Sequence, residues 1–284
     1  MKISALLTAL LRRVRRWSDA RKAARFLDPH ELEKIHRHHH ATLETVPSWM
    51  PAGLRENSLF QYGVPDEISQ LINRDIGNGI TYSDALVGLS RRLRKKPCYL
   101  EIGVSVGKNF LQVAASLEDA DLVGFDLEEI NPVLLAQFQN LGRTSWPAAA
   151  AVHGKIEASL TQLRPNGSNN RVRYLSADVF DDSSWERLKG SKFNLVFSDA
   201  LHTPHALLAE HEMLCRHNLL DDEELIMLWD DLGGNLTPAF HEICRRLKER
   251  PQFARASSFI APLKGWLGDN WGDHSVGFFI SVHE

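Results

Sequence analysis

From residue 98 onward, short apolar runs alternate with stretches of helical periodicity, and this alternation constrains the fold more than any other feature. Strands are expected near 98–104, 121–127, 171–177, 193–199, 224–230, 256–262 and 275–282. Helices are expected near 107–118, 131–142, 183–189, 204–219 and 236–249, with residues 146–163 as a helical insertion over the sheet. Such alternation predicts an α/β doubly wound fold with a seven-stranded sheet, which binds ligands at the carboxyl ends of its strands.

The segment between the last two expected strands is short. Residues 264–273, KGWLGDNWGD, are rich in glycine and tryptophan and leave no room for a covering helix. A parallel crossover needs about a dozen residues or more, so the last strand should run antiparallel to its neighbours. A wholly parallel dinucleotide-binding fold is therefore disfavoured. Trp266 and Trp271 in this segment either wall the pocket or pack between elements.

The first 90 residues have a helical pattern and are expected to form a separate N-terminal region, followed by the α/β domain at 91–284. Residues 1–27 carry eight lysines and arginines against Asp19, although the whole chain has a formal net charge of −3. Their apolar residues recur at helical spacing, which predicts a basic amphipathic helix. Such a helix packs on its own protein, mediates self-association, or makes peripheral contact with an anionic membrane surface.

Composition narrows the classes of function. Three scattered cysteines, Cys98, Cys215 and Cys244, exclude a disulfide framework and indicate a reducing, cytoplasmic location, with the inner membrane face as the alternative. No convincing signal peptide or transmembrane segment is recognised. The histidines at 36–40 have no matching carboxylate or cysteine pattern, so we expect a surface helix there and no metal site. Because the α/β domain is acidic, nucleic-acid binding is disfavoured.

The stretch 98–110, CYLEIGVSVGKNF, places a glycine turn after the first expected strand. A dinucleotide fingerprint requires glycine where Ser105 stands. A Walker loop requires four residues between its glycines, whereas three separate Gly103 and Gly107. Asp126 ends the next strand, about twenty residues beyond the turn, where a carboxylate can accept hydrogen bonds from ribose hydroxyls. The sequence therefore predicts a nucleoside ligand.

The segment Glu101-Ile-Gly103-Val-Ser-Val-Gly107 resembles the E-x-G-x-x-x-G motif of class I S-adenosylmethionine-dependent methyltransferases. The resemblance covers roughly residues 98–282 and implies a Rossmann-like fold. It also implies that Gly103 and Gly107 lie against the methionine and ribose parts of the cofactor. Many members have glycine at the position of Ser105. The cofactor-binding residues implied by this resemblance are Glu101, Gly103, Ser105, Gly107, Asp126 for the ribose, and Asp178 for the adenine amino group.

Acidic residues mark the ends of the fourth and fifth expected strands. Asp199 ends the fourth, His202 follows three residues later, and Asp230 and Asp231 end the fifth. Three carboxylates at neighbouring strand ends repel one another unless a cation lies among them, and hard oxygen ligands suit Mg²⁺ or a similar divalent ion. The alternatives are a helix cap for Asp199 and a solvated turn for Asp231.

This arrangement is similar to that of metal-dependent O-methyltransferases, particularly those that act on macrolide-linked sugars, where D-x-x-H follows the fourth strand and an acidic pair ends the fifth. The similarity implies metal ligation by Asp199, Asp230 and Asp231, with His202 as general base. The predicted enzyme (EC 2.1.1) methylates the hydroxyl of a small molecule, such as a sugar or secondary metabolite.

Two alternatives remain open. One is a metal-independent N-methyltransferase or lipid-headgroup methyltransferase, held at a membrane surface by the basic helix. The other is a non-catalytic cofactor-binding fold that serves as a scaffold through its N-terminal helices. Chelation of divalent metals would abolish turnover only in the metal-dependent enzyme.

Overall fold

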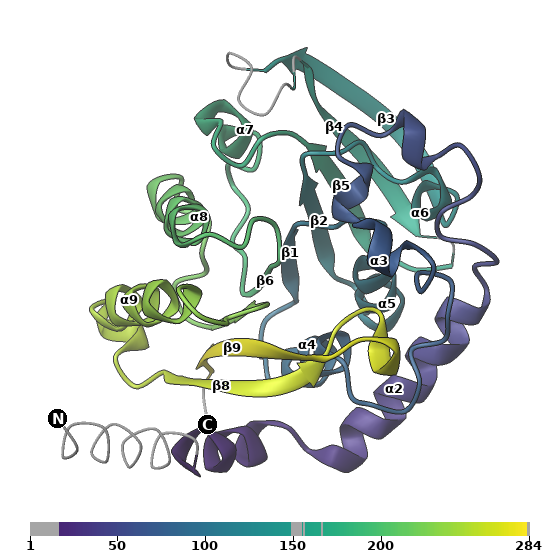
Figure 1. Cartoon of the computed structure of the whole chain (residues 1–284). Helices are drawn as coiled ribbons and strands as arrows, with labels where there is room; N and C mark the ends of the chain where they lie inside the picture. The colour runs from purple at the N-terminus through teal and green to yellow at the C-terminus, as the bar shows by residue number, and fades with distance from the viewer. Residues whose placement is uncertain (1–16, 149–154, 156, 166, 283–284) are drawn as a thin grey trace, which may run out of the picture.

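The computed structural model describes residues 17–148, 155, 157–165 and 167–282 (Figure 1). Most of the predicted basic helix lies outside these residues, although 17–26 are helical. Within the described part, nine strands form one sheet in the order β3-β4-β5-β2-β1-β6-β7-β9-β8. The strands are β1 Cys98–Ile102, β2 Asp121–Asp126, β3 Phe138–Pro147, β4 Glu157–Pro165, β5 Arg171–Ser176, β6 Leu195–Ser198, β7 Leu225–Trp229, β8 Ser257–Lys264 and β9 Asp273–Ser281.

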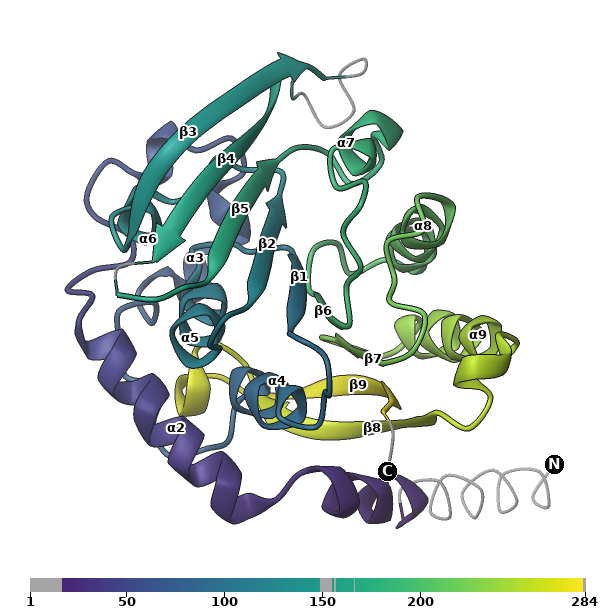
Figure 2. The ribbon, with the colours of Figure 1, turned by 180° about the vertical axis from the view of Figure 1, so that it is seen from behind.

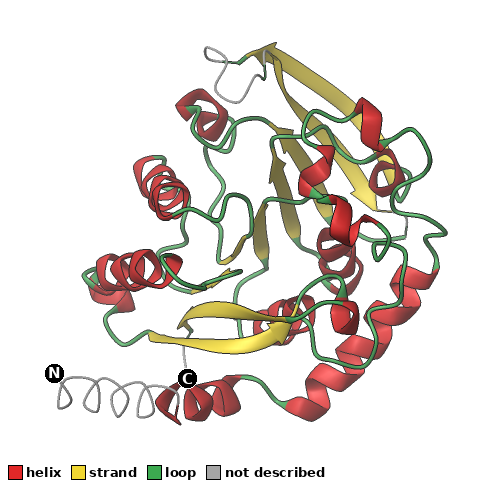
Figure 3. Cartoon of the chain, in the orientation of Figure 1, coloured by secondary structure: helices red, strands yellow, loops and turns green. Residues whose placement is uncertain are grey.

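Helices lie on both faces of this sheet, as Figure 3 shows by secondary structure. The α-helices are α2 Pro29–Glu44, α3 Asp66–Ser69, α4 Tyr82–Ser90, α5 Lys108–Ser116, α6 Pro132–Leu135, α7 Asp182–Glu186, α8 Pro204–Arg216 and α9 Leu236–Lys248. Short 3-10 turns are η1 Arg55–Asn57, η2 Gln61–Gly63, η4 Pro251–Phe253 and η5 Gly268–Asn270. One apolar cluster joins α2, α4 and α5 to the sheet, and a second joins α7, α8 and α9 to the opposite face (Figure 2).

The centre of the sheet is parallel, and its strands end level with one another. Strands β5, β2, β1, β6 and β7 run parallel. Ile102 pairs with Phe125 and with Ser198, and Ser198 pairs with Trp229. The residues that follow these strands therefore meet at one edge, as expected from the sequence. The predicted antiparallel last strand is confirmed, because β9 is antiparallel to both β7 and β8.

The predictions of seven strands and of a helical insertion are wrong. Residues 138–147 and 157–165 form the antiparallel hairpin β3–β4, which pairs with the edge of β5. The expected helix at 131–142 shrinks to α6, and no helix forms at 146–163 among the described residues. Pro147 and Pro165 disfavour a helix here. Along β4, the buried residues Thr161 and Leu163 alternate with the exposed residues Gln162 and Arg164, and β5 offers an open edge to such a strand.

The helix expected at the histidine cluster forms, but it does not lie wholly on the surface. Helix α2 begins after Asp28, whose side chain accepts a hydrogen bond from His30 N at 2.9 Å and so caps the helix. Within α2, His36 and His39 are buried and face Asp84 on α4. One apolar cluster contains residues from both sides of residue 90. The domain boundary proposed there stays a prediction. Among the described helices, none is long and apolar enough to cross a membrane.

Candidate active site

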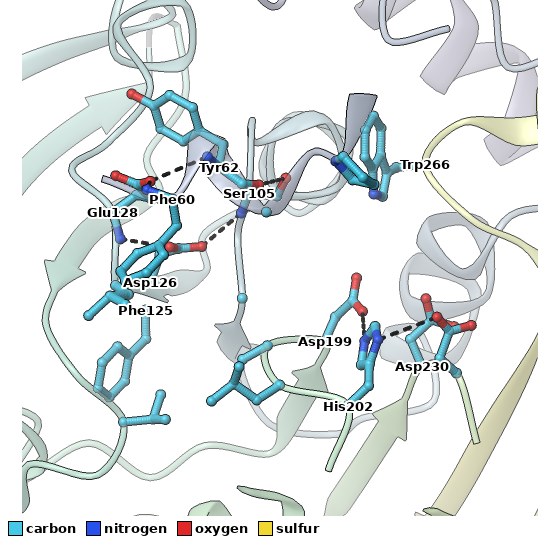
Figure 4. Close-up of a pocket in the computed structure, with 18 of the residues that line it drawn as sticks. Phe60, Tyr62, Ser105, Phe125, Asp126, Glu128, Asp199, His202, Asp230 and Trp266 are labelled. Atoms are coloured by element: carbon cyan, nitrogen blue, oxygen red, sulfur yellow. Dashed lines mark hydrogen bonds and ion pairs between the residues drawn. The ribbon is translucent and has the colours of Figure 1, made fainter. Parts of the chain in front are cut away.

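A cavity of about 510 Å³ lies at the carboxyl ends of the central strands. It brings together loops that follow β1, β2, β5, β6 and β7, with one wall from residues 60–68 and another from residues 266–274. Eight predicted site residues line it: Gly103, Ser105, Asp126, Asp178, Asp199, His202, Asp230 and Asp231. Figure 4 shows how several of these side chains lie around it.

The glycine turn after β1 has a backbone that other residues cannot adopt freely. Gly103 has φ +86°, and a Cβ built there would lie 2.4 Å from the backbone oxygen of Asp199. The turn can therefore pass close to the loop after β6 only because residue 103 has no side chain. Gly107, at φ +93°, does not line the cavity and faces Leu134 instead.

Ser105, where many methyltransferases have glycine, also has a positive φ of +54°. Its hydroxyl donates a hydrogen bond to the backbone oxygen of Tyr62 at 2.6 Å. The serine thus joins the turn to the N-terminal segment that forms a wall of the cavity, a contact that glycine could not make.

Asp126, at the end of β2, holds the glycine turn in place (Figure 4). Its Oδ2 accepts hydrogen bonds from Val104 N at 2.7 Å and Ser105 N at 2.8 Å, and its Oδ1 accepts one from Glu128 N at 2.8 Å. Burial raises the pKa of Asp126 above its ordinary value in spite of these bonds. A carboxylate offers about four acceptor positions, so one position remains for a ligand hydroxyl.

One wall of the cavity comes from the N-terminal region, which the sequence patterns did not connect with the site. Phe60 and Tyr62 line the cavity, and the carboxylate of Glu128 accepts hydrogen bonds from the backbone N–H groups of Leu59, Phe60 and Tyr62. Glu128 therefore fastens this segment to the end of β2. The acidic run after β2 was visible in the sequence, but no spacing rule joins it to a segment almost seventy residues upstream.

His202 lies between the carboxylates of two different loops (Figure 4). Its Nε2 donates to Asp199 Oδ1 at 3.1 Å, and its Nδ1 lies 3.5 Å from Asp231 Oδ2. The hydrogen bond to Asp199 is the main reason that the pKa of His202 rises to about 9. Burial, followed by the charge of Asp230, raises the pKa of Asp199 to about 7. Asp199 and His202 therefore form a hydrogen-bonded pair that can hold and release a proton.

A second histidine lies against the carboxylates of Asp230 and Asp231, and the sequence did not predict it. Nδ1 of His274, in β9, lies 2.7 Å from Asp230 Oδ2 and 3.1 Å from Asp231 Oδ1. Burial lowers the pKa of His274, but its hydrogen bonds to Asp230 and Asp231 outweigh this effect and raise it to about 10. A lone histidine near the start of a strand gives no sequence signal, because its partners lie more than forty residues away.

The group formed by Asp230, Asp231 and His274 suits a divalent cation. Asp230, Asp231 and His274 each offer one ligand atom, and these atoms lie within 4.8 Å of one another. Oδ1 of Asp230 is buried and has no hydrogen-bond partner among the described residues. Buried carboxylate oxygens normally have such a partner, and oxygen donors suit Mg²⁺. Asp199 is not part of this three-residue group, and its carboxylate accepts a hydrogen bond from His202.

Asp178, Glu101 and the two tryptophans complete the set of predicted residues. Asp178 follows β5, and its Oδ1 accepts a hydrogen bond from Phe180 N at 2.8 Å. Glu101 lies in β1, 1% exposed, and lines a second cavity of about 10 Å³ that adjoins the first. Trp266 and Trp271 line the main cavity, in agreement with the aromatic wall considered from the sequence.

Comparison with known proteins gives distant likenesses only. No family model and no curated protein matches the chain. Solved structures that align with it include the O-methyltransferase from Bacillus cereus in complex with SAH, at 14% identity over 92% of this chain and 96% of that chain, with a TM-score of 0.43. Another is the O-methyltransferase TomG from Streptomyces achromogenes, involved in tomaymycin synthesis and in complex with SAM, at 15% identity over 77% and 91% of the two chains, with a TM-score of 0.44.

A third is the SAH-bound methyltransferase PaMTH1 from Podospora anserina, at 16% identity over 89% of this chain and 97% of that chain, with a TM-score of 0.39.

Proposed function

We propose that this chain is an S-adenosylmethionine-dependent methyltransferase that methylates a hydroxyl group of a small molecule. The observation that carries the proposal is that one cavity combines the glycine turn and Asp126 with the Asp199–His202 pair. The glycine turn and Asp126 suit a nucleoside, and the Asp199–His202 pair suits removal of a proton from the methyl acceptor. A sugar or secondary metabolite is the acceptor class that the sequence resemblance implies.

On this proposal, the nucleoside part of the cofactor lies between the end of β2 and the segment at 60–62. Asp126 accepts a hydrogen bond from a ribose hydroxyl at its remaining acceptor position. Asp178 lies by the adenine, and Phe60 and Phe125 provide apolar surface for the base. S-adenosylmethionine supplies a methyl group on a positively charged sulfur.

His202 is the proposed general base. It takes the proton of the acceptor hydroxyl while the hydroxyl oxygen bonds to the methyl carbon, and the electron pair of the broken carbon–sulfur bond stays on sulfur. Asp199 orients the imidazole through its hydrogen bond to Nε2 and stabilises the imidazolium that forms. Trp266 and Trp271 reduce the access of water to the cavity and position the acceptor.

With the pKa of His202 near 9, the imidazole is protonated at neutral pH and must lose that proton before it can act as a base. A divalent cation held by Asp230 and Asp231, together with Asp199 as the sequence predicts or His274 as the distances favour, would supply positive charge that lowers the pKa of His202 and of the acceptor hydroxyl. Magnesium-assisted O-methylation is therefore the form of the proposal that these residues suit best.

The test combines binding with turnover. Calorimetry should detect S-adenosylhomocysteine binding to the full chain, and labelled S-adenosylmethionine with Mg²⁺ and fractionated metabolites should yield a labelled product. His202→Gln should lower kcat by about 10²–10⁴-fold and leave cofactor affinity unchanged. His205→Gln, in the first turn of α8, is the matched control. A wild-type protein that binds no S-adenosylhomocysteine would refute the proposal.

Removal of the metal separates the alternatives. EDTA should abolish turnover, and added Mg²⁺ should restore it, because the carboxylates would otherwise keep His202 protonated. Turnover that is insensitive to chelation would favour the metal-independent N- or lipid-headgroup methyltransferase. Cofactor binding without transfer to any fraction would favour the scaffold.

A further inference from the structure

Lys108 is a buried cation that has no buried anion beside it. It begins α5, its side chain is 2% exposed, and its Nζ donates to the backbone oxygens of Ile72 at 3.1 Å and Arg74 at 3.4 Å. No carboxylate of the residues that the structure describes lies within 4.0 Å of this nitrogen. Burial lowers the pKa of Lys108 to about 8, the direction expected for an ammonium group that lacks a close counter-ion.

The other buried lysine in the described part of the chain is arranged differently. Nζ of Lys155 also donates to a backbone oxygen, that of Leu127, but it lies 3.7 Å from the carboxylate of Glu129. Burying an ammonium group without an anion is costly, because two carbonyl dipoles do not replace its hydration. An ammonium has three donors, and the two backbone oxygens use only two of those on Lys108. Lys108 therefore has both the charge and a donor available for an anionic ligand.

Lys108 lies at an extension of the candidate active site. Together with Glu101 and Asn109, it lines the small cavity of about 10 Å³. This cavity shares Gly103, Ser105, Asp199 and Trp266 with the main cavity. The ring of Trp266 lies 5.8 Å from Nζ, so the lysine and the aromatic wall are neighbours. A volume of this size admits about one water-sized polar group, such as the end of a larger ligand.

The same small cavity holds a buried acid. Glu101 accepts hydrogen bonds from the Tyr99 hydroxyl at 2.6 Å and from Asn109 Nδ2 at 2.8 Å, and the described part of the chain gives it no lysine or arginine partner within 4.0 Å. Burial raises its pKa to about 8. An acid and a base that line one cavity, and that do not pair with each other, are complementary to a ligand that carries an ammonium and a carboxylate on one carbon.

We infer that Lys108 binds the carboxylate of the amino-acid end of S-adenosylmethionine and so selects for a cofactor in which that end is intact. This inference rests on the proposed function, because it takes the ligand of the main cavity to be that cofactor. Lys108 follows Gly107 directly, so the glycine turn carries the carboxylate-binding residue on its own helix. A nucleoside thioether that lacks the amino acid should bind the same site weakly.

Two ligands test the inference on the full chain. S-adenosylhomocysteine carries the amino-acid end, whereas 5′-methylthioadenosine has the same nucleoside and sulfur without it. Calorimetry should show that the wild-type protein prefers S-adenosylhomocysteine. Lys108→Met should lower the affinity for S-adenosylhomocysteine by about 10–100-fold, the worth of a buried charge-assisted hydrogen bond, and change that for methylthioadenosine by less than about 3-fold. Lys155→Met, the matched control, should leave the affinities for both ligands unchanged.

Each result has one meaning. An unchanged affinity of Lys108→Met for S-adenosylhomocysteine, or an equal loss for both ligands, overturns the inference, and the equal loss would show that Lys108 only fastens the backbone at 72–74. A wild-type protein that binds both ligands equally overturns the inference and leaves the nucleoside site intact. A wild-type protein that binds neither ligand overturns the proposed function itself. If Lys108→Met does not fold, Lys108→Gln keeps donors for the two backbone oxygens without the charge and should show the same selective loss.

Discussion

At the residue scale, the site depends on a few positions that no other side chain could fill without a local rearrangement. Gly103 brings the loops after β1 and β6 within contact distance, and Ser105 ties the same turn to the N-terminal segment. Sequence spacing identified both positions. It could not identify their partners. A positive φ and a close approach of two loops are marked in the sequence only by the type of residue at that one position.

Gly103→Ala tests how tightly the turn is packed. The new Cβ would lie 2.4 Å from the backbone oxygen of Asp199 at a φ of +86°, so we expect a loss of about 2–4 kcal/mol in the free energy of unfolding, together with loss of cofactor binding. Urea denaturation measures the first effect and calorimetry the second. Gly272→Ala is the control, because a Cβ there meets nothing within 4 Å. Equal stability of both variants would contradict this account.

Glu101 should make the stability of the ligand-free protein depend on pH. Its pKa is raised to about 8 by burial, whereas glutamate in an unfolded chain titrates near its ordinary value of 4.5. Between these values the folded state keeps a proton that the unfolded chain releases, so rising pH favours unfolding by at most about 1.4 kcal/mol per unit. Glu101→Gln should lose less stability than the wild type between pH 5 and pH 8 in urea titrations. If the free energies of unfolding of the variant and the wild type change with pH in parallel, Glu101 does not titrate in this range.

At the element scale, a buried cluster joins helix α2 to the start of α4. His36 Nδ1 and His39 Nδ1 lie 2.7 Å and 2.6 Å from the two oxygens of Asp84, and Nε2 of His36 lies 3.0 Å from the backbone oxygen of Gly77. Both nitrogens of His36 therefore face acceptors, so this imidazole must carry two protons. The sequence showed the histidines but not Asp84, because the pairing depends on how two helices pack.

Asp84→Asn should destabilise the fold by about 3–5 kcal/mol, because it leaves the His36 imidazolium buried without its counter-ion. The pKa of Asp84 is lowered, so its contribution is lost as pH falls below 3.8 toward the folded value. Burial lowers the pKa of His36, but Asp84 outweighs this and raises it, so that contribution is lost as pH rises above 6.5. The difference from wild type should be largest near pH 5–6 in thermal unfolding.

Asp66→Asn is the control for that experiment. Asp66 forms an ion pair with Arg55 at 2.6 Å, but its side chain is 90% exposed. Exposed pairs contribute about 1 kcal/mol or less. A loss in Asp84→Asn no larger than that in Asp66→Asn would mean that the cluster does not hold α2 in place.

The β3–β4 hairpin is the element that sequence patterns predicted least well. Most of β3 is exposed, so its residues show little apolar periodicity, and the apolar positions of 131–142 fit a helix as well as a strand. What decides the conformation is the free edge of β5, a partner supplied only by the tertiary fold. By contrast, Asp126, Asp199 and Asp230 each lie at the end of a central strand with a strong local signal, and their convergence followed from parallel topology alone.

At the scale of the whole molecule, the N-terminal helices and the sheet share one apolar core. Leu32, Ile35 and Trp49 belong to the same buried cluster as Phe110 and Phe278. The site is shared in the same way, since residues 60–68 form a wall of the cavity. Sequence periodicity separated the two regions because a change of pattern, from helical to alternating, says nothing about which surfaces pack together.

A chain that comprises residues 91–284 alone should not fold cooperatively. Its sheet would expose the apolar face that α2 and α4 cover, and burial of apolar surface is the main favourable contribution to folding. Near-UV circular dichroism should lack the fixed aromatic signal of the full chain, and urea unfolding should be broad. A sharp transition with a native near-UV spectrum would show that residue 90 is a true domain boundary.

Strand β9 lies between β7 and β8, although it follows both in the chain. During synthesis, β7 must therefore keep an unpaired edge and β8 must wait without its main partner until residues 273–281 have left the ribosome. His274 arrives with the same segment. A nascent chain that stalls before this point would expose the unpaired edges of β7 and β8 to chaperones. The candidate site would also be incomplete, because it would lack His274.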